Sequence, residues 1–134
     1  GAERTWYAQR ENCVHDLLHT LTGYGQDAAG ETALLAFCDG LYSQTFRLRV
    51  VRFGMIASVV SSPPTSIPRT LEFFLRARSR GARARIPSAY RWEEKLGAPL
   101  KSVQRELRIK NLRDTHPQGV LQGDTAGWDV LPRT

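Results

Sequence analysis

The helical spacing of apolar residues in the first third of the chain constrains the fold most. From residue 4 to about residue 21, apolar side chains recur every three to four positions and so share one face of a helix; they are Tyr7, Val14, Leu17, Leu18 and Leu21. The run Gly23-Tyr24-Gly25 ends this helix. After a polar, glycine-bearing turn, Asp27 is a candidate cap for a second helix, which we expect to be long and to continue to about Val60.

Prolines and glycines divide the rest of the chain. Ser61-Ser62-Pro63-Pro64 stops helical geometry, and a third helix is predicted from Pro68 to about Arg80, with Gly81 closing it. Residues 89–96 suggest a short amphipathic turn or helix, and Pro99 opens another helix from residue 100 to about residue 108. We expect both to dock on the core.

The C-terminal end has a different pattern. Residues 114–134 contain several glycines and prolines and little periodicity, which is typical of an extended arm. There is no strand pattern and no internal repeat. The prediction is therefore an all-α fold, with one compact domain of four to five helices in residues 1–110 and an extended arm in residues 111–134.

Composition limits the class of protein. A chain of 134 residues with 41% apolar and 24% charged residues is typical of one soluble globular domain. Arginines at positions 47, 49 and 52 interrupt the longest apolar region, so no membrane-spanning helix is expected. The two cysteines, Cys13 and Cys38, lie in predicted helices, which argues against a disulfide-rich secreted scaffold and favours a reducing compartment.

The net charge of +6 raises the question of nucleic-acid binding. The dense basic block lacks the zinc-finger spacing, basic zipper or interleaved aromatic residues of a nucleic-acid motif, so nucleic acid is not an expected partner. Contact with anionic lipid headgroups and a merely solvated helix end are comparable alternatives for this block; it comprises Arg76, Arg78, Arg80, Arg83 and Arg85.

Candidate metal ligands lie at the end of the first predicted helix. His15 and His19 are four residues apart, so their imidazoles lie on one face, one turn apart, and can share a metal ion. Asp16 lies about 60° from His19 around the helix axis and could bind the ion or orient a histidine.

Glu31 is the fourth candidate ligand. It shares a helical face with Leu35, Cys38 and Tyr42, and an inward carboxylate needs a partner. If the glycine-bearing turn folds the second helix back on the first, Glu31 approaches His19. Nitrogen and oxygen ligands without cysteine suit zinc or non-haem iron.

An alternative interpretation keeps these residues structural. His15, Asp16 and His19 could form a surface cluster, with Glu31 as a first-turn residue that the helix dipole favours; the spacing alone does not separate the two interpretations. A zincin peptidase is a poor fit, since Asp16 replaces the glutamate of His-Glu-x-x-His.

The run HDLLHTLTGYGQDAAGE at residues 15–31 resembles the signature of the coenzyme Q biosynthesis protein four family: His-Asp, two residues, His, eleven residues, Glu. The resemblance extends from about Trp6 to Ile109 and includes a C-terminal set: Trp92, Glu93, Leu96, Pro99, Leu100, Val103, Arg105, Leu107 and Ile109. Two departures from the family pattern are expected. Leu18 stands where an aromatic residue is expected, and we expect the family's N-terminal helical part to be missing from this sequence.

The resemblance implies a role in ubiquinone biosynthesis: metal-dependent removal of the ring carboxyl group from a polyprenylated hydroxybenzoate, alone or coupled to ring hydroxylation. His15, Asp16, His19 and Glu31 would hold one divalent ion, with zinc favoured over iron, and Tyr24 would be either a donor behind the ligands or a structural residue of the turn. A polyprenyl tail needs an apolar groove, although each candidate lining residue is more often core: Leu34, Leu41, Leu48, Phe53, Met55, Phe73 and Phe74.

The expected partners follow from the same resemblance. They are an isoprenoid quinone precursor, other quinone-biosynthesis proteins, the membrane surface and further copies of the chain. A bacterial protein of this kind would be cytoplasmic or peripheral at the inner membrane, and a eukaryotic one would lie on the matrix side of the mitochondrial inner membrane. The rival hypothesis is a metal-stabilised lipid-binding or scaffold protein that performs no chemistry.

Overall fold

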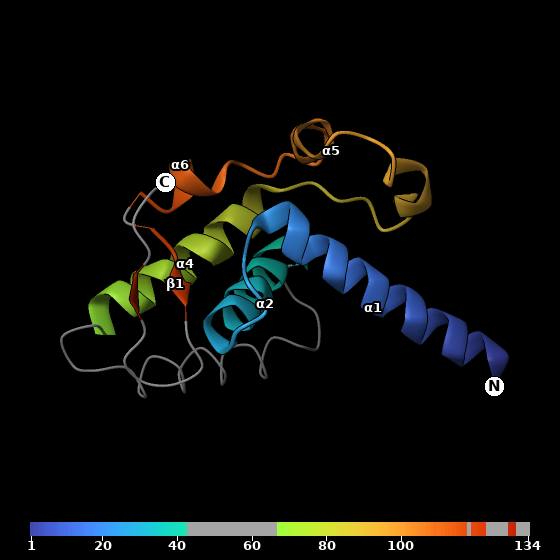
Figure 1. The fold of residues 1–134 in the computed structure, drawn as a ribbon, viewed down its shortest axis with the longest axis horizontal. Helices are drawn as coiled ribbons and strands as arrows, with labels where there is room; N and C mark the ends of the chain where they lie inside the picture. The colour runs from blue at the N-terminus through green and yellow to red at the C-terminus, as the bar shows by residue number, and fades with distance from the viewer. Residues whose placement is uncertain (43–66, 118, 123–128, 131–134) are drawn as a thin grey trace.

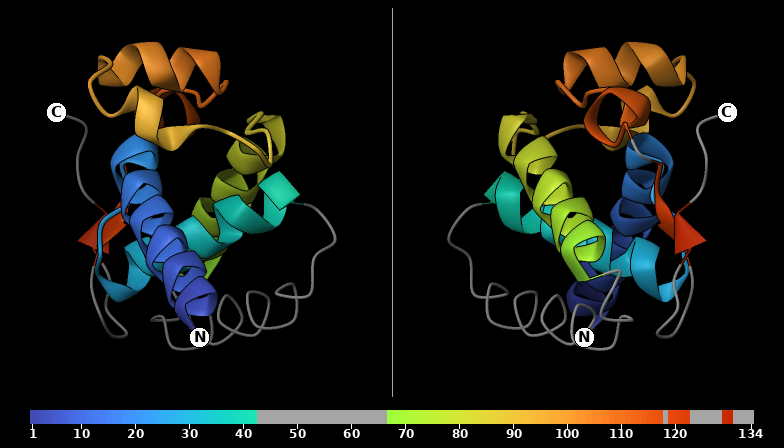
Figure 2. Two further views of the ribbon diagram at one scale, coloured as in Figure 1. Left: turned by 90° about the vertical axis from the view of Figure 1, so that its right-hand side faces the viewer. Right: turned by 90° about the vertical axis from the view of Figure 1, so that its left-hand side faces the viewer.

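Helices form almost all of the regular structure in the computed structural model, which describes residues 1–42, 67–117, 119–122 and 129–130. The long helices are α1 (Ala2–Thr22), α2 (Ala28–Tyr42) and α4 (Ile67–Arg83), and Figure 2 shows α2 lying across the other two. Shorter elements follow: the 3-10 helix η2 (Trp92–Lys95), α5 (Leu100–Glu106), α6 (Leu112–Thr115), and the two-residue strands β1 (Leu121–Gln122) and β2 (Asp129–Val130), which pair antiparallel. The predicted all-α fold class is confirmed.

The helix α1 ends as the sequence predicts. Gly23 adopts the left-handed conformation with φ 81°, and its N–H donates to the His19 carbonyl oxygen at 2.9 Å. Figure 1 shows the N-terminal part of α1 projecting away from the other helices. The buried residues of α1 begin only at Leu18, and Tyr7, expected on the buried face, is exposed.

The crossing of α2 and α4 brings two backbones together at glycines. A Cβ atom at Gly40 would lie 1.9 Å from the Arg78 carbonyl oxygen, and one at Gly81 would lie 1.9 Å from the Phe37 carbonyl oxygen. The prediction that Gly81 closes the third helix is wrong, because α4 continues to Arg83. Gly81 instead lies where the two helices cross, because a residue without a side chain lets their backbones come close together.

The core contains several residues expected to line an apolar groove. Leu34 and Phe74 are fully buried and Phe73 nearly so, while Leu41 packs against the core. The candidates Leu48, Phe53 and Met55, like the predicted continuation of the second helix beyond Tyr42, lie outside the described residues.

The C-terminal elements close one end of the helical framework. Trp92 of η2 and Val103 of α5 are buried, as predicted for elements that dock on the core. Residues 112–115 form the short helix α6, and the following His116 is buried in the domain. The domain boundary at residue 110 stays a prediction. No helix among the described residues is long and apolar enough to cross a membrane.

Candidate metal centre

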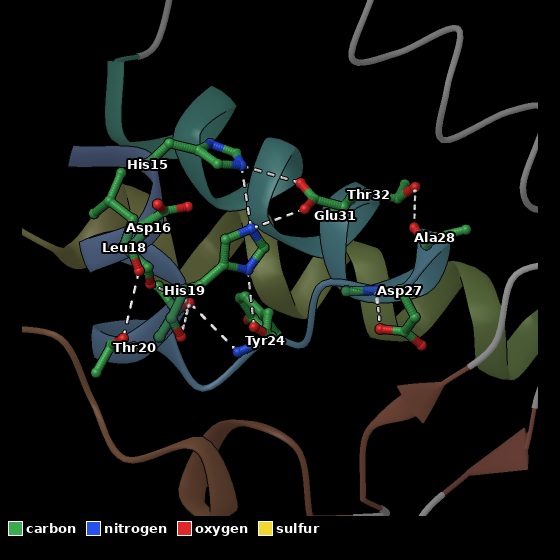
Figure 3. A network of polar contacts seen from close by, with 12 residues as sticks. His15, Asp16, Leu18, His19, Thr20, Tyr24, Asp27, Ala28, Glu31 and Thr32 are labelled. Atoms are coloured by element: carbon green, nitrogen blue, oxygen red, sulfur yellow. Dashed lines mark hydrogen bonds and ion pairs between the residues drawn. The ribbon is translucent and has the colours of Figure 1, made fainter. Parts of the chain in front are cut away.

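Three side chains from α1 and α2 converge on one point. His15 Nε2 lies 3.1 Å from Glu31 Oε2, and His19 Nε2 lies 3.0 Å from Glu31 Oε1. The two Nε2 atoms are themselves 3.1 Å apart, and Figure 3 shows both rings turned toward the Glu31 carboxylate. The sequence expectation that the glycine-bearing turn brings Glu31 to His19 is confirmed.

The tautomer of His19 follows from its second contact. His19 Nδ1 lies 2.9 Å from the backbone carbonyl oxygen of Tyr24 (Figure 3). A carbonyl oxygen can only accept, so Nδ1 is the protonated nitrogen and donates. In the neutral ring Nε2 is therefore an unprotonated lone pair that faces Glu31.

This arrangement suits a bound metal ion. An unprotonated His19 Nε2 and the Glu31 carboxylate are both acceptors, and at 3.0 Å their lone pairs face each other. A metal ion bound between them would be coordinated by both lone pairs. Two ligands at 2.0–2.1 Å from a tetrahedral zinc are about 3.3 Å apart, so the observed separations of 3.0–3.1 Å fit a shared ion.

The cluster has a closed and an open side. The His19 side chain is 6% exposed, whereas those of His15 and Glu31 are 43% and 40% exposed. An ion held here would have protein on the His19 side and access from solvent on the other. Three protein ligands with an accessible fourth position are typical of catalytic rather than structural zinc sites.

The turn between α1 and α2 places Glu31. Asp27 Oδ1 accepts from the Gly30 N–H at 3.2 Å and so caps the start of α2 (Figure 3). A Cβ atom at Gly30 would lie 2.0 Å from the Gly25 carbonyl oxygen, so only glycine allows this close approach. Glu31 follows at once, in the first turn of α2.

Asp16 lies beside this cluster. The converging ligand atoms come from His15, His19 and Glu31, and Asp16 is not among them. Its side chain is exposed on α1. Its role as a ligand or orienting group stays a prediction.

Tyr24 contributes through its backbone and is fixed through its side chain. Its hydroxyl group lies 2.9 Å from His116 Nε2, and the Arg80 guanidinium sits 5.3 Å from the centre of its ring. Burial raises the pKa of the Tyr24 hydroxyl, while the charge of Arg80 opposes this shift. Tyr24 therefore remains a protonated donor at neutral pH.

His116 is the residue here that the sequence did not indicate. Burial, and then the charges of Arg80 and Arg76, lower its pKa to about 3. The ring is therefore neutral, and its Nε2 shares a hydrogen bond with the Tyr24 hydroxyl group. Its Nδ1 is buried and has no hydrogen-bond partner among the described residues.

The predicted headgroup-contacting arginines are not alike. Arg80 is 2% exposed and donates to the carbonyl oxygens of Lys110 and Thr22. The prediction that Arg80 contacts lipid headgroups is wrong, because its side chain is buried and bonded to these carbonyl oxygens, which lie far away in the sequence. Arg76 pairs with Glu72 and Arg78 with Asp39; Arg83 and Arg85 are exposed.

A mostly apolar groove runs between the outer part of α1 and η2. On α1 it is lined by residues that include Trp6, Val14 and Leu17, and on η2 and the adjoining turn by Trp92 and Leu96. Val14 and Leu17 immediately precede and follow the His15-Asp16 pair. The sequence places both on the apolar face of the first helix, but helical periodicity does not separate a core face from the wall of a groove.

Comparison with known proteins identifies a family. The family model described as "Coenzyme Q (ubiquinone) biosynthesis protein Coq4" matches residues 2–113, which contain His15, His19 and Glu31. No curated protein and no solved structure matches the chain.

Proposed function

Because this chain belongs to the coenzyme Q (ubiquinone) biosynthesis protein Coq4 family, we propose that it uses one divalent metal ion to remove the ring carboxyl group of a polyprenylated hydroxybenzoate. His15, His19 and Glu31 hold the ion in this proposal. Membership of this family gives the chain a part in ubiquinone biosynthesis.

One observation carries the metal-dependent part of the proposal. Three potential ligand atoms converge, all from side chains that bind metals in proteins. Because His19 Nδ1 donates to the Tyr24 carbonyl oxygen, the Nε2 atom of the neutral ring is free to bind an ion. Two histidines and one carboxylate suit both catalytic zinc and non-haem iron(II). The donor chemistry therefore fits the group that the resemblance implies.

The chemistry of the substrate sets what the site must do. A hydroxyl group para to the carboxylate donates electron density to the ring carbon that bears the carboxylate. When that carbon is protonated, the carbon–carbon bond can break and release carbon dioxide, with the bonding electron pair returning to the ring. A bound ion supplies Lewis acidity and a template that orients the carboxylate.

The residues of the chain supply binding and orientation. The exposed edges of His15 and Glu31 border the open side from which the substrate ring approaches. The buried His19, held by the Tyr24 carbonyl oxygen, fixes the inner wall. A fixed ligand geometry lowers the cost of orienting the substrate.

The polyprenyl tail is proposed to lie in the groove between α1 and η2. Its walls include Trp6, Leu17 and Leu96, and Leu17 is two residues from His15. A tail in this groove would leave the ring near the metal centre. Burial of apolar chain contributes about 0.8 kcal/mol per methylene group. The protein would contact the membrane that contains its substrate peripherally, with the exposed Arg83 and Arg85 beside anionic headgroups.

The test is a decarboxylation assay of the metal-loaded protein on a polyprenylated 4-hydroxybenzoate. Carbon dioxide release and ring products would be measured with zinc or iron(II), with and without dioxygen and a reductant, for wild type and Glu31→Ala. We expect metal-dependent release that Glu31→Ala abolishes. Release without dioxygen indicates simple decarboxylation, whereas a strict requirement for iron and dioxygen indicates coupling to ring hydroxylation.

A metal-stabilised lipid-binding or scaffold protein is the outcome that would replace this proposal. In that case wild type binds metal and the polyprenylated compound, yet no carbon dioxide is released under any of the assay conditions.

A further inference from the structure

The turn that orients His19 is contacted by a segment that lies much later in the sequence. This segment, here called the α6 clamp, comprises residues 112–116. His116 Nε2 lies 2.9 Å from the Tyr24 hydroxyl, across 92 positions of sequence. Leu112, at the other end of the clamp, lies against Gly23, the residue before Tyr24. A Cβ atom at Gly23 would lie 3.1 Å from Leu112 Cδ2.

The clamp is itself fixed to the helical framework. Arg76 of α4 donates to the Thr115 carbonyl oxygen at 3.2 Å. Within the clamp, the His116 N–H donates to the Leu112 carbonyl oxygen at 2.8 Å. The clamp therefore links α4 to the turn, which it contacts at two residues, Gly23 and Tyr24.

The burial of His116 is costly and invites an explanation. The side chain is 2% exposed, and its Nδ1 has no partner in the described part of the chain. An unsatisfied buried polar atom destabilises the fold, and such an exception calls for an explanation. Among the described residues, the polar partner of this ring is the Tyr24 hydroxyl group.

Building on the proposed metal site, we propose that His116 is a positioning residue for it. By holding the Tyr24 hydroxyl, His116 fixes the backbone of Tyr24, whose carbonyl oxygen accepts from His19 Nδ1 and so keeps His19 Nε2 directed at the ion. His116 lies beyond residues 2–113, which the family model matches. The positioning contact is therefore supplied from outside the family-matched part of the chain.

The test compares His116→Phe and Tyr24→Phe, which each remove one partner of the contact, with their double variant. Tyr90→Phe is the matched control, because it removes another tyrosine hydroxyl, bonded to Glu106 at 3.1 Å. His116→Gln is the conservative variant, since its amide can still bond the Tyr24 hydroxyl. All are compared at a temperature where circular dichroism shows each variant to be folded.

Two quantities are measured. The first is the affinity for Co²⁺, from its visible absorption. The second is the tautomer of His19 in the metal-free protein, from long-range proton–nitrogen NMR correlations. Outer partners of metal ligands typically contribute 10–100-fold to affinity; one step farther out, we expect losses of about 5–20-fold in both single variants. The double variant should lose no more, and His116→Gln should recover most of the loss.

The tautomer separates this inference from the proposed function. We expect His19 to be protonated at Nδ1 in wild type and Tyr90→Phe, and to become a mixture of tautomers in His116→Phe and Tyr24→Phe. An unchanged tautomer and unchanged Co²⁺ affinity in the two folded variants would overturn the positioning role. If wild type itself binds no Co²⁺, the proposed function fails, while the tautomer still decides whether His116 positions His19.

Discussion

His19 Nδ1 donates to the backbone carbonyl oxygen of Tyr24 at 2.9 Å, and this one contact decides which ring nitrogen of His19 is left to face Glu31. Metal-binding histidines typically donate their other N–H to a fixed acceptor, which sets the tautomer and the ring orientation. The candidate site therefore includes the turn that supplies this carbonyl as well as the three converging side chains.

The contribution of Glu31 is tested by Glu31→Gln, which keeps the size of the side chain and removes its charge. We expect metal affinity to fall by at least about 100-fold, more than for loss of an outer partner. Isothermal titration with Zn²⁺ measures the change, and Glu72→Gln on α4 is the control. A Glu31→Gln variant that retained wild-type affinity would remove Glu31 from the site.

Asp16→Asn tests the role that is still a prediction for Asp16. Since the Asp16 side chain is exposed and is not among the converging ligand atoms, we expect the Zn²⁺ affinity to fall far less than in Glu31→Gln. A loss as large as that of Glu31→Gln would instead identify Asp16 as a ligand, with a rearranged side chain in the metal-bound protein.

The histidine pair and Glu31 were predictable because the signals are local. Helical periodicity puts His15 and His19 on one face, and a short turn leaves Glu31 few positions to occupy. The burial of Arg80 and the Tyr24–His116 contact were not predictable in this way, since their partners are 30, 58 and 92 residues away. Gly81 illustrates an ambiguity: the same residue type ends helices and permits close helix packing.

The helix crossing predicts which glycines tolerate a side chain. Gly40→Ala and Gly81→Ala should each destabilise the fold by about 1–3 kcal/mol, because the new methyl group would meet the backbone of the opposite helix. Gly97→Ala is the control, since nothing lies within 4 Å of a Cβ atom there. Urea unfolding measures all three. Equal stability of the Gly81 and Gly97 variants would contradict the close crossing.

The low pKa of His116 predicts a pH dependence of stability. As the pH falls below 6.5, His116 takes up a proton in the unfolded chain, whereas in the folded chain it does so only near pH 3. The free energy of unfolding should therefore fall with pH across this window, and His116 alone contributes about 1.4 kcal/mol per pH unit.

The variant His116→Gln isolates this contribution, because every other titrating group remains in both proteins. The difference in unfolding free energy between wild type and variant, followed by urea unfolding between pH 7 and pH 4, should change with that slope. A difference that does not depend on pH would show that His116 is not held neutral by the fold.

The groove between α1 and η2 predicts a change that depends on the substrate. Leu96→Glu introduces a charge into the groove, whereas Leu100→Glu places the same charge on another exposed leucine, outside it. If the tail binds in the groove, Leu96→Glu should raise KM for the polyprenylated substrate by about 10-fold. This estimate assumes that the charge prevents the burial of roughly two methylene groups of the tail. KM for a tail-free hydroxybenzoate should be unchanged. Equal effects of the two variants on both substrates would place the tail elsewhere.

Elemental analysis of the purified protein tests the metal centre most directly. Wild type, His19→Ala and the control Glu72→Gln would be analysed by inductively coupled plasma mass spectrometry after their folding is verified. We predict nearly one zinc or iron per chain in wild type and in the control, and its loss in His19→Ala. The absence of metal from wild type even after reconstitution, or full retention in His19→Ala, would contradict a metal centre at His15, His19 and Glu31.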